Sequence, residues 1–421
     1  MDQGGTRNLM EPLTMNIDDW VKGVESFLAE HVHESWRQDF INSALDAGLP
    51  TRKTEEWRYT RIKPLFDKGL ALSTNMGKVK DGFTSLEGFK IVTRNGQLVS
   101  ADELPTGISV SDISESGAPD SALKTDPITA LAVGTYATGL LIIIEENINL
   151  KKPLVLIEQT NLQAGQTASV RHRFEICSGA KAQVIEHHSS TEGSFGLINR
   201  ITEMDVAESA NFDHHQIQDL SELNAVHSIR TQQAGRSVFS TTVYTFSGAL
   251  VRNNLDIAIN GEYAVTNLNG LHLTQGSEHV DNHTRVDHKV PNCNSNEIYR
   301  GVLGGKSTGV FNGKVYVHQD AQITNAYQSN RNILISDSAV MNSKPELEIY
   351  ADDVKSSHGC TIGQMDKEAL FYLRSRGLST EASINLLLHA FAGEVLEAIS
   401  SEGLRAWIEE RIAHKMKTIN V

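Results

Sequence analysis

Two side chains able to bind a transition metal, the imidazole of His358 and the thiol of Cys360, stand two residues apart in the segment SSHGCT. If this segment is a β-strand, both side chains lie on the same face and could reach one iron ion. An iron–sulfur cluster normally takes four protein ligands. Cys177 and Cys293 lie far away along the chain and no C-x-x-C pair occurs, so any cluster at this position must be shared with another subunit. We interpret Cys177 and Cys293 as buried apolar thiols.

A histidine-rich segment, residues 272–288, offers a second candidate metal site. Its polar side chains are His272, His279, Asp281, His283, Asp287 and His288. The four-residue spacing of His279 and His283 places both on one face only in a helix, whereas the neighbouring segments have the pattern of strands. In a strand, Asp281, His283 and Asp287 share a face, and His288 points away. We therefore prefer polar side chains on a β-surface and keep a metal-dependent hydrolase as an alternative.

The segment GVLGGKSTG, residues 301–309, looks like a phosphate-binding loop but fails its pattern. The first glycine of that pattern would stand at position 300, which is Arg300. The strand-like run VFNGKVYV follows where a helix N-terminus should receive the phosphates. Any ATP-driven step must therefore come from a partner.

Two further enzyme classes can be weighed from motifs and composition. No G-x-S-x-G motif of a serine hydrolase occurs. The aromatic content of 6% argues against a cleft that stacks sugar rings, although a polysaccharide-acting β-helix enzyme stays open as an alternative.

The composition indicates a cytoplasmic protein that binds neither nucleic acid nor membranes. Its 421 residues exceed the usual size of a single hydrophobic core, so two or three packed units are expected. The formal net charge of −14 repels phosphate backbones. The first ten residues lack the apolar region of a signal peptide, and the longest dense apolar run, Leu140–Ile144, is too short to span a bilayer. Three widely spaced cysteines fit a reducing compartment better than a disulfide framework.

Hydrophobic periodicity divides the chain into three regions. Residues 1–135 are predicted to be helical and mixed, with helices over residues 17–28 and 36–44. In residues 136–363, short β-branched runs such as LLIII, LVLIE and NILIS alternate with turns that carry small residues, such as SGAKA and NGEYA. Small corner residues and polar strands suited to in-register stacking favour a solenoid over a sandwich or a barrel. We therefore expect a parallel β-helix core.

Residues 364–421 return to helical spacing. Asp366 is the expected N-cap of a first helix and Gly377 its stop, and a longer helix starts at Ser379 or Thr380. The apolar faces of these helices can pack on the core or dock a second protein. The first helix is too short to bury all its faces, and it carries three residues with the composition of a binding hot spot: Phe371, Tyr372 and Arg374.

Three segments together resemble the SufB/SufD family of iron–sulfur cluster assembly proteins, and more closely its SufD branch. The first is GLPTRKTEEWRY at residues 48–59. The second runs from Val286 through YRGVL and VFNGKVYV to AYQSNRNILIS, and the third is NSKPELEIYADDVKSSHGCTIGQMDKEALFYLRSRG at residues 342–377. The resemblance covers most of the chain and is densest between residues 280 and 395.

This resemblance implies a right-handed parallel β-helix and a non-catalytic scaffold that acts with a SufB-like subunit and a SufC-like ATPase in cluster assembly and iron acquisition. In the family, the C-terminal helical region binds SufC, and the SufB–SufD interface lies near the ends of the two β-helices. His358 matches an interface histidine that lies close to a SufB cysteine. The lone chain is expected to be a homodimer with no tightly bound cofactor, and iron or an iron–sulfur cluster would be shared with SufB.

The sequence departs from the family pattern beside His358. Many SufD-like sequences read KCSHGAT, whereas this chain reads KSSHGCT. Ser356 therefore stands where a cysteine is common, and no cysteine role carries over to it. If Cys360 substitutes, the thiol keeps the same strand face but moves about 13 Å along an extended strand.

Overall fold

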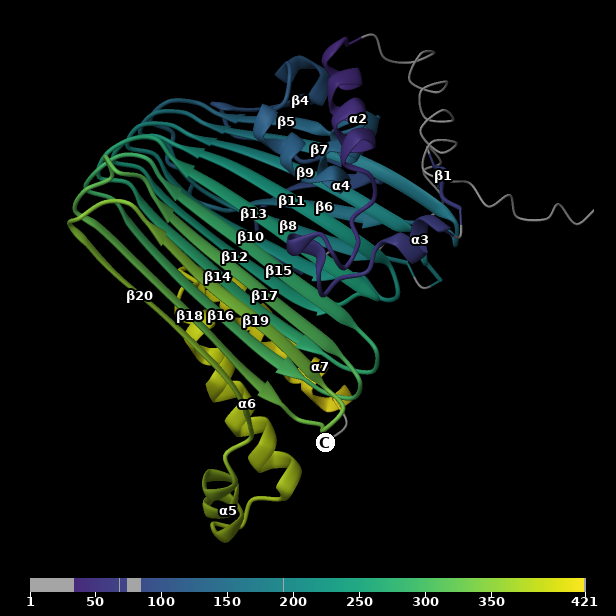
Figure 1. Ribbon diagram of the computed structural model, residues 1–421, viewed down its shortest axis with the longest axis vertical. Helices are drawn as coiled ribbons and strands as arrows, with labels where there is room; N and C mark the ends of the chain where they lie inside the picture. Colours follow the sequence, from purple (N-terminus) through teal and green to yellow (C-terminus); the bar gives the residue numbers. More distant parts are fainter. Residues whose placement is uncertain (1–33, 68, 74–84, 192, 420–421) are drawn as a thin grey trace, which may run out of the picture.

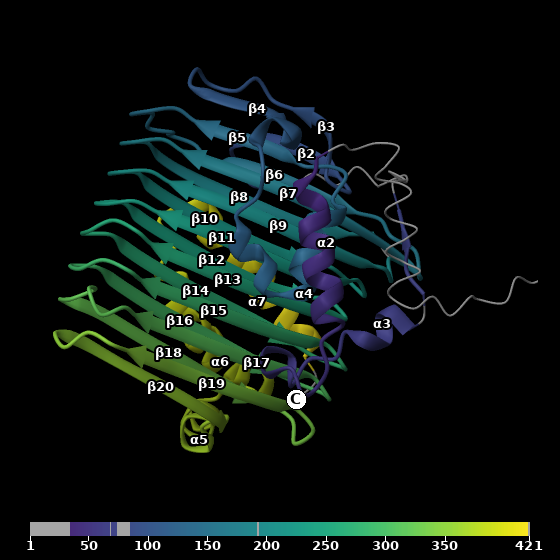
Figure 2. The same cartoon turned by 45° about the horizontal axis from the view of Figure 1, so that its top comes forward.

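The computed structural model describes residues 34–67, 69–73, 85–191 and 193–419, and its centre is a solenoid of two large β-sheets (Figure 1). Strands that follow one another in the chain alternate between the two sheets, so each coil contributes one strand to each sheet. Within the body of the solenoid all paired strands are parallel and in register. The expected parallel β-helix is confirmed, and Figure 2 shows the coils stacked along its axis.

The two sheets, called A and B here, have the following strands. Sheet A contains β1 Ala71–Leu72, β4 Ile108–Asp112, β5 Leu140–Ile144, β7 Gln166–Ile176, β9 Leu197–Val206, β11 Asn224–Gln233, β13 Leu250–Ile259, β15 His279–His288, β17 Thr308–Val317 and β19 Val340–Ile349. Sheet B contains β2 Phe89–Arg94, β3 Gln97–Ala101, β6 Leu154–Thr160, β8 Lys181–Ser190, β10 Asn211–Asp219, β12 Val238–Ser247, β14 Val265–Thr274, β16 Asn294–Leu303, β18 Thr324–Leu334 and β20 Val354–Gln364. Among the described strands, antiparallel pairing occurs only at the N-terminal end, where β4 pairs with β5 and β3 with β2.

Small residues mark the corners where the chain turns from one sheet into the other. Successive corners from sheet A into sheet B carry fully buried small residues, in chain order Ala180, Ala210, Ser237, Ala264 and Cys293. The residue before each of them has a positive φ, for example +61° at Ser209. A sharp bend of this kind brings the following side chain into the coil, where only a small side chain fits beneath the next layer. Cys293 is thus buried as predicted, whereas Cys177 is only half-buried and that part of the prediction is wrong.

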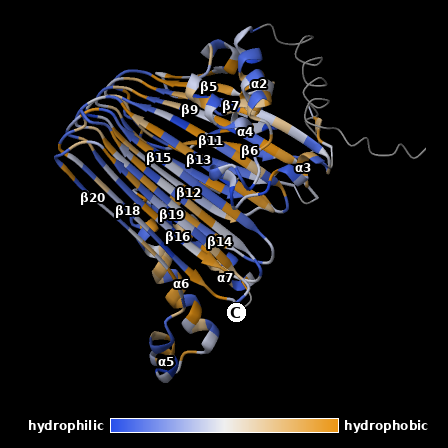
Figure 3. Ribbon diagram, viewed as in Figure 1, coloured by the Kyte–Doolittle hydropathy of each residue, from blue (hydrophilic) through white to orange (hydrophobic). Residues whose placement is uncertain are grey.

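Alternation along the strands sends every second side chain into the solenoid. Figure 3 shows that hydrophilic and hydrophobic residues are interspersed along the strands of both sheets. Much of the interior is apolar and stacked in ladders. Phe212 and Phe239, which pair in register on β10 and β12, have ring centroids 5.9 Å apart. Polar ladders occur as well, since Asn253 donates to Asn282 of the next coil at 2.9 Å.

A buried ionic group lies inside the first coils. Glu158 of β6, His172 of β7 and Arg200 of β9 all point inward and have essentially no exposed surface. Arg200 pairs with one carboxylate oxygen of Glu158, and His172 Nε2 lies 2.8 Å from the other. The Leu140 amide donates to His172 Nδ1, so the imidazole proton sits on Nε2 and is donated to Glu158. Although burial alone would raise the pKa of Glu158, the Arg200 charge and the His172 hydrogen bond hold it far below its usual range.

Helices cover the outer faces of both sheets. Their bounds are α2 Trp36–Ala47, α3 Lys63–Asp67, α4 Pro127–Thr135, α5 Lys367–Ser375, α6 Thr380–Leu396 and α7 Glu402–Thr418, with short 3₁₀ turns η1 Glu55–Trp57, η2 Ile113–Ser116 and η3 Ser121–Thr125. On sheet A, α4 packs against Leu197 and Ile201 of β9, and α2 packs on α4. On sheet B, α6 and α7 bury Ile384, Leu388 and Ile408 against β12, β14 and β16.

The predicted helices can now be compared with these elements. The helix expected over residues 36–44 is α2, while the one expected over 17–28 lies outside the described residues. The carboxylate of Asp366 caps α5 by accepting from the amides of Glu368 and Ala369, Gly377 follows that helix with φ +94°, and Ser379 caps α6, all as predicted. The division of the chain into units at residues 135 and 363 stays a prediction. Among the described helices, none combines the length and the apolar character needed to cross a membrane.

Candidate functional site at the open end of the solenoid

In the described part of the chain, no further strand covers the C-terminal end of the solenoid. Strands β19 and β20 are the last in their sheets and each has a neighbour on one side only. The residues of β20 are mostly exposed, whereas β18 beneath it is largely buried at alternate positions. Several apolar side chains are exposed at this end, among them Ile349 at 38% and Ile362 at 46%. An end coil with free strand edges and exposed apolar side chains is suited to pairing with another chain.

His358 and Cys360 lie side by side on this end coil. The segment SSHGCT is part of β20, as the sequence analysis required. In register, His358 lies over Gln328 and Cys360 over Asn330, two residues of β18 that point into the solenoid. Both site residues therefore face the solenoid axis on a coil above which no described strand is stacked, and both are exposed. Side chains two residues apart along a strand are about 6.6 Å apart at their Cα atoms.

The side chains beneath this pair are polar, and the sequence analysis did not identify them. Cys360 Sγ lies 3.9 Å from Asn330 Oδ1, which also accepts hydrogen bonds from Ser343 Oγ at 2.8 Å and Asn332 Nδ2 at 2.7 Å. His358 and Cys360 of β20 are about 30 positions away in the chain from Gln328 and Asn330, their neighbours on β18. The repeat length of the coil is the sequence signal that could have brought them together.

This geometry presents two donors to an approaching partner. An imidazole and a thiol on one face suit iron in chemical type. Among the described residues no group of three or more histidine, cysteine and acidic side chains is placed to hold a metal ion. A cluster at this end would need more ligands than the described residues bring together.

The three residues of the expected hot spot lie together on α5. Phe371 is 74% exposed and Tyr372 is 56% exposed, and Arg374 on the same helix is exposed as well. None of the residues of α5 is buried. In Figure 1 this helix stands away from both sheets, at the far end of α6. The helices α6 and α7 thus pack on the core, which was the first of the two predicted roles for the C-terminal helices, while the aromatic pair of α5 stays exposed.

The histidine-rich segment is divided between two strands: His272 lies on β14 of sheet B, whereas His279, Asp281, His283, Asp287 and His288 lie on β15 of sheet A. Asp281 and His283 point outward, where the N-terminal segment covers them. Asp281 accepts from Arg252 at 2.8 Å, and His283 lies 2.9 Å from Asp281 and 3.3 Å from Glu56. The His283 hydrogen bond lowers the pKa of Glu56. Arg252 neutralises the Asp281 carboxylate. We therefore interpret these contacts as an ion-pair network that fixes the N-terminal segment to sheet A.

The glycine-rich segment around Gly304 and Gly305 is a tight turn between β16 and β17. Gly305 has φ +61°, and a side chain there would collide with the backbone of Gly276 in the preceding coil. The strand β17 follows directly, as expected from the failed phosphate-loop pattern. The glycines therefore serve close stacking of successive corners.

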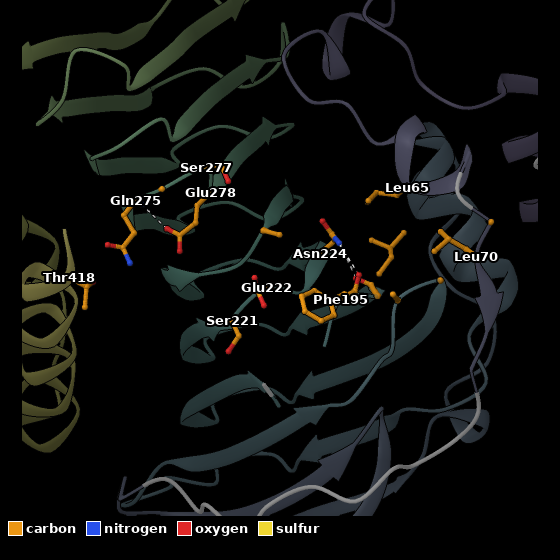
Figure 4. Close-up of a pocket in the computed structure, with 17 residues that line it drawn as sticks. Leu65, Leu70, Phe195, Ser221, Glu222, Asn224, Gln275, Ser277, Glu278 and Thr418 are labelled. Carbon is orange, nitrogen blue, oxygen red and sulfur yellow. Dashed lines mark hydrogen bonds between the residues drawn. The ribbon is translucent and has the colours of Figure 1, made fainter. Parts of the chain in front are cut away.

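A cavity of about 800 Å³ lies along the corners where the chain turns from sheet B into sheet A, between α3 and the end of α7 (Figure 4). Its lining consists mostly of turn residues, including Ser221 and Asn224. Two carboxylates line it, and one of them, Glu278, is paired with Lys415 at 3.0 Å. No residue of the predicted site lines this cavity, so it does not compete with the open end as the candidate site.

Comparison with known proteins identifies the family of this chain. Residues 157–391 match the family model described as the SufBD core domain of the SUF system for FeS cluster assembly. The iron–sulfur cluster assembly protein SufD of Escherichia coli is 31% identical over 393 residues, which cover 90% of this chain and 92% of that protein. An iron–sulfur cluster assembly SufBD family protein of Synechocystis is 28% identical over 398 residues, with 87% of each chain covered. The chain therefore belongs to the SufB/SufD family of iron–sulfur cluster assembly proteins and is similar to SufD.

Proposed function

We propose that this chain is the SufD-like subunit of a cytoplasmic SufBCD complex and serves there as a non-catalytic scaffold for cluster assembly and iron acquisition. The uncovered end coil carries the proposal, because it offers free strand edges together with His358 and Cys360. A SufB-like subunit stacked on β20 would cover the exposed apolar side chains and complete the ligand set. Iron or an iron–sulfur cluster is then cargo held between two subunits, and the lone chain binds no cofactor tightly.

We assign the contact with the SufC-like ATPase to α5. Its aromatic pair is exposed, and Arg376 lies over the Tyr372 ring at 5.2 Å, which holds that ring in place. Aromatic residues beside arginine are the composition of binding hot spots. Since the segment around Gly305 is a turn between strands, the energy of ATP hydrolysis would enter through this partner.

The proposal is tested by His358→Ala in the complex reconstituted with SufB and SufC. Because His358 is exposed on the end coil and has a stacked neighbour on one side only, the variant should keep its stability within about 0.5 kcal/mol. Loss of an iron ligand should lower the iron and sulfide recovered on the complex about tenfold or more. Iron and sulfide are measured after anaerobic reconstitution and gel filtration.

Two matched variants accompany this measurement. Ser357→Ala changes the neighbouring exposed residue on the opposite strand face and should leave cluster recovery unchanged. Cys360→Ala should have a smaller effect than His358→Ala, because alanine is common at this position in similar sequences. Normal cluster recovery with His358→Ala in a complex that has formed would contradict the role of this histidine.

Without SufB, the same end coil is expected to pair two copies of this chain. Ile349 and Ile362 both face the solenoid axis at the open end, and a second copy would bury them. Introducing lysine at both positions should weaken the homodimer at least about tenfold, because each charge would have to be buried. Light scattering over a range of micromolar concentrations measures the change.

The control is Leu98→Lys, which places one charge on an equally exposed leucine at the N-terminal end of sheet B. This variant should dimerise like the unmodified chain. A monomeric unmodified chain, or a dimer that survives lysine at both isoleucines, would count against pairing through the end coil.

A further inference from the structure

The buried carboxyl group of Glu297 on β16 has no basic partner in the described part of the chain. Glu297 is 4% exposed, and no positive charge contributes to its pKa. Glu158 and Glu186, which are also buried, differ in this respect, since Glu158 pairs with Arg200 and Glu186 lies 3.3 Å from Nε2 of His214. A carboxyl that is buried without a counter-charge is favoured in its neutral form.

The contacts of Glu297 suit a carboxylic acid better than a carboxylate. Gln328 of β18, its neighbour in register, donates from Nε2 to Glu297 Oε2 at 2.6 Å. Glu297 Oε1 and Gln328 Oε1 are both buried, and neither has a partner among the described residues. Both atoms are acceptors while the carboxyl is ionised, so they cannot satisfy each other. A proton on Glu297 Oε1 makes that atom a donor, and the acid and the amide can then form two hydrogen bonds side by side.

The side chains around this pair supply no charge at neutral pH. Among the strands packed around Glu297, β14 contributes His272, β15 contributes His288 and β16 itself contributes Tyr299, whereas the described inward-facing residues of β17 and β18 include no titratable side chain. Burial lowers the pKa of each histidine to about 4 and raises the pKa of Tyr299 well above its ordinary value, so all three are neutral. Burial also raises the pKa of Glu297 to about 7, so its carboxyl can gain or lose a proton near neutral pH.

Glu297 lies beneath the candidate site at the open end. In register, His358 of β20 lies over Gln328, and Gln328 lies over Glu297. Neighbouring strands are about 4.8 Å apart, so one row of side chains would separate a cation held by His358 from the carboxyl. In an interior of low dielectric constant, that charge favours the ionised carboxyl. A glutamine could make the same two hydrogen bonds with Gln328, but only a carboxyl can change its charge.

We propose that Glu297 is the counter-charge of a divalent cation at the open end, protonated in the free chain and ionised when the cation is bound beside His358. On binding, the O–H bond of the carboxyl breaks, the electron pair stays on the carboxylate, and the proton passes to the solvent. No electron is transferred. Because the two events are linked, a higher pH favours the cation, and a bound cation favours loss of the proton. The identity of the cation as iron rests on the proposed function, but the proton on Glu297 does not.

The first test is infrared difference spectroscopy of the full-length chain and of Glu297→Gln. At pH 6 the unmodified chain should show the carbonyl band of a protonated carboxylic acid that Glu297→Gln lacks, and this band should fade at pH 8. The variant should fold normally, because its amide can keep both hydrogen bonds to Gln328.

The second test compares the Co²⁺ affinity of the complexes reconstituted with SufB and SufC, measured by anaerobic equilibrium dialysis. At pH 8 the unmodified complex should bind Co²⁺ at least about fivefold more tightly than the complex with Glu297→Gln. At pH 6 the two affinities should agree within about twofold, because binding must first expel the proton. Titration of His358 and Cys360 affects both complexes alike and cancels in the comparison.

The matched control is Glu175→Gln. Glu175 is a partly exposed carboxylate on β7, near the other end of the solenoid. This variant should keep the acid band and the pH dependence of the unmodified chain.

The outcomes separate the counter-charge from the proposed function. Identical infrared bands for the unmodified chain and Glu297→Gln at pH 6 would show that Glu297 is ionised and would overturn the proposal. A ratio of the two Co²⁺ affinities that is the same at pH 6 and pH 8 would overturn the link to the cation. Co²⁺ affinity that depends on Glu297 and pH but not on His358 would support the counter-charge and contradict the proposed ligand. A chain that recruits neither SufB nor SufC would contradict the proposed function, while the infrared spectra would still decide whether Glu297 holds a proton.

Discussion

Replacing Phe371 and Tyr372 together by alanine is expected to weaken binding of the SufC ATPase at least about 30-fold, the equivalent of about 2 kcal/mol for a single hot-spot aromatic. Both side chains are more than half exposed on a helix without a buried residue, so the free chain loses little packing when they are removed. The thermal midpoint of the lone chain should therefore stay unchanged. Isothermal titration of the purified chain with SufC measures the affinity.

Phe195→Ala provides the control for this experiment, because Phe195 is 47% exposed at a corner of the solenoid far along the chain from α5. It should bind SufC normally. Point substitutions are preferable to truncation at residue 364, since truncation would also remove α6 and α7 and expose the apolar face of sheet B that they cover. If the doubly substituted chain is folded and binds SufC at full affinity, the contact lies elsewhere.

Glu158→Gln is expected to destabilise the chain by about 3–5 kcal/mol, the cost of leaving a buried charge without its partner. Glu158 is the carboxylate that Arg200 and His172 share inside the solenoid. The amide keeps the shape of the side chain but removes the negative charge, so the Arg200 guanidinium stays buried and uncompensated. Urea denaturation at pH 7 measures the difference.

The pH dependence follows from the lowered pKa of Glu158. An unfolded glutamate titrates near pH 4.3, and the folded one only far below that. The stability that this ionised carboxylate contributes is therefore complete above about pH 5 and declines as the pH falls below about 4. The difference between Glu158→Gln and the unmodified chain should narrow accordingly between pH 7 and pH 3.

A surface carboxylate serves as the comparison. Glu175 pairs with Arg173 at 3.1 Å but is one-third exposed, so Glu175→Gln should cost no more than about 0.5 kcal/mol. A difference below 1 kcal/mol for Glu158→Gln would show that the buried ionic group contributes little to folding.

The sequence alone determined the class of fold and the family, because both depend on local patterns. Short β-branched runs and small corner residues reflect the period of the coil, so the β-helix could be predicted without knowing which strands pair. The caps of α5 and α6 were equally readable, since an N-cap needs only its own side chain and the next few amides. His358 and Cys360 could be placed on one face because a strand alternates with period two.

Tertiary structure decided everything that depends on which coil lies next to which. No local pattern tells that Gln328 and Asn330 lie beneath His358 and Cys360, because strands stacked in register are about 30 residues apart in the chain. Burial of the polar interior, from Glu158 to His272, likewise follows from stacking, since the same residues on an edge strand would be solvated. The exposure of β20 has the same cause. This strand belongs to the last coil, and only the pairing of all the other strands shows that no strand in the described part of the chain covers it.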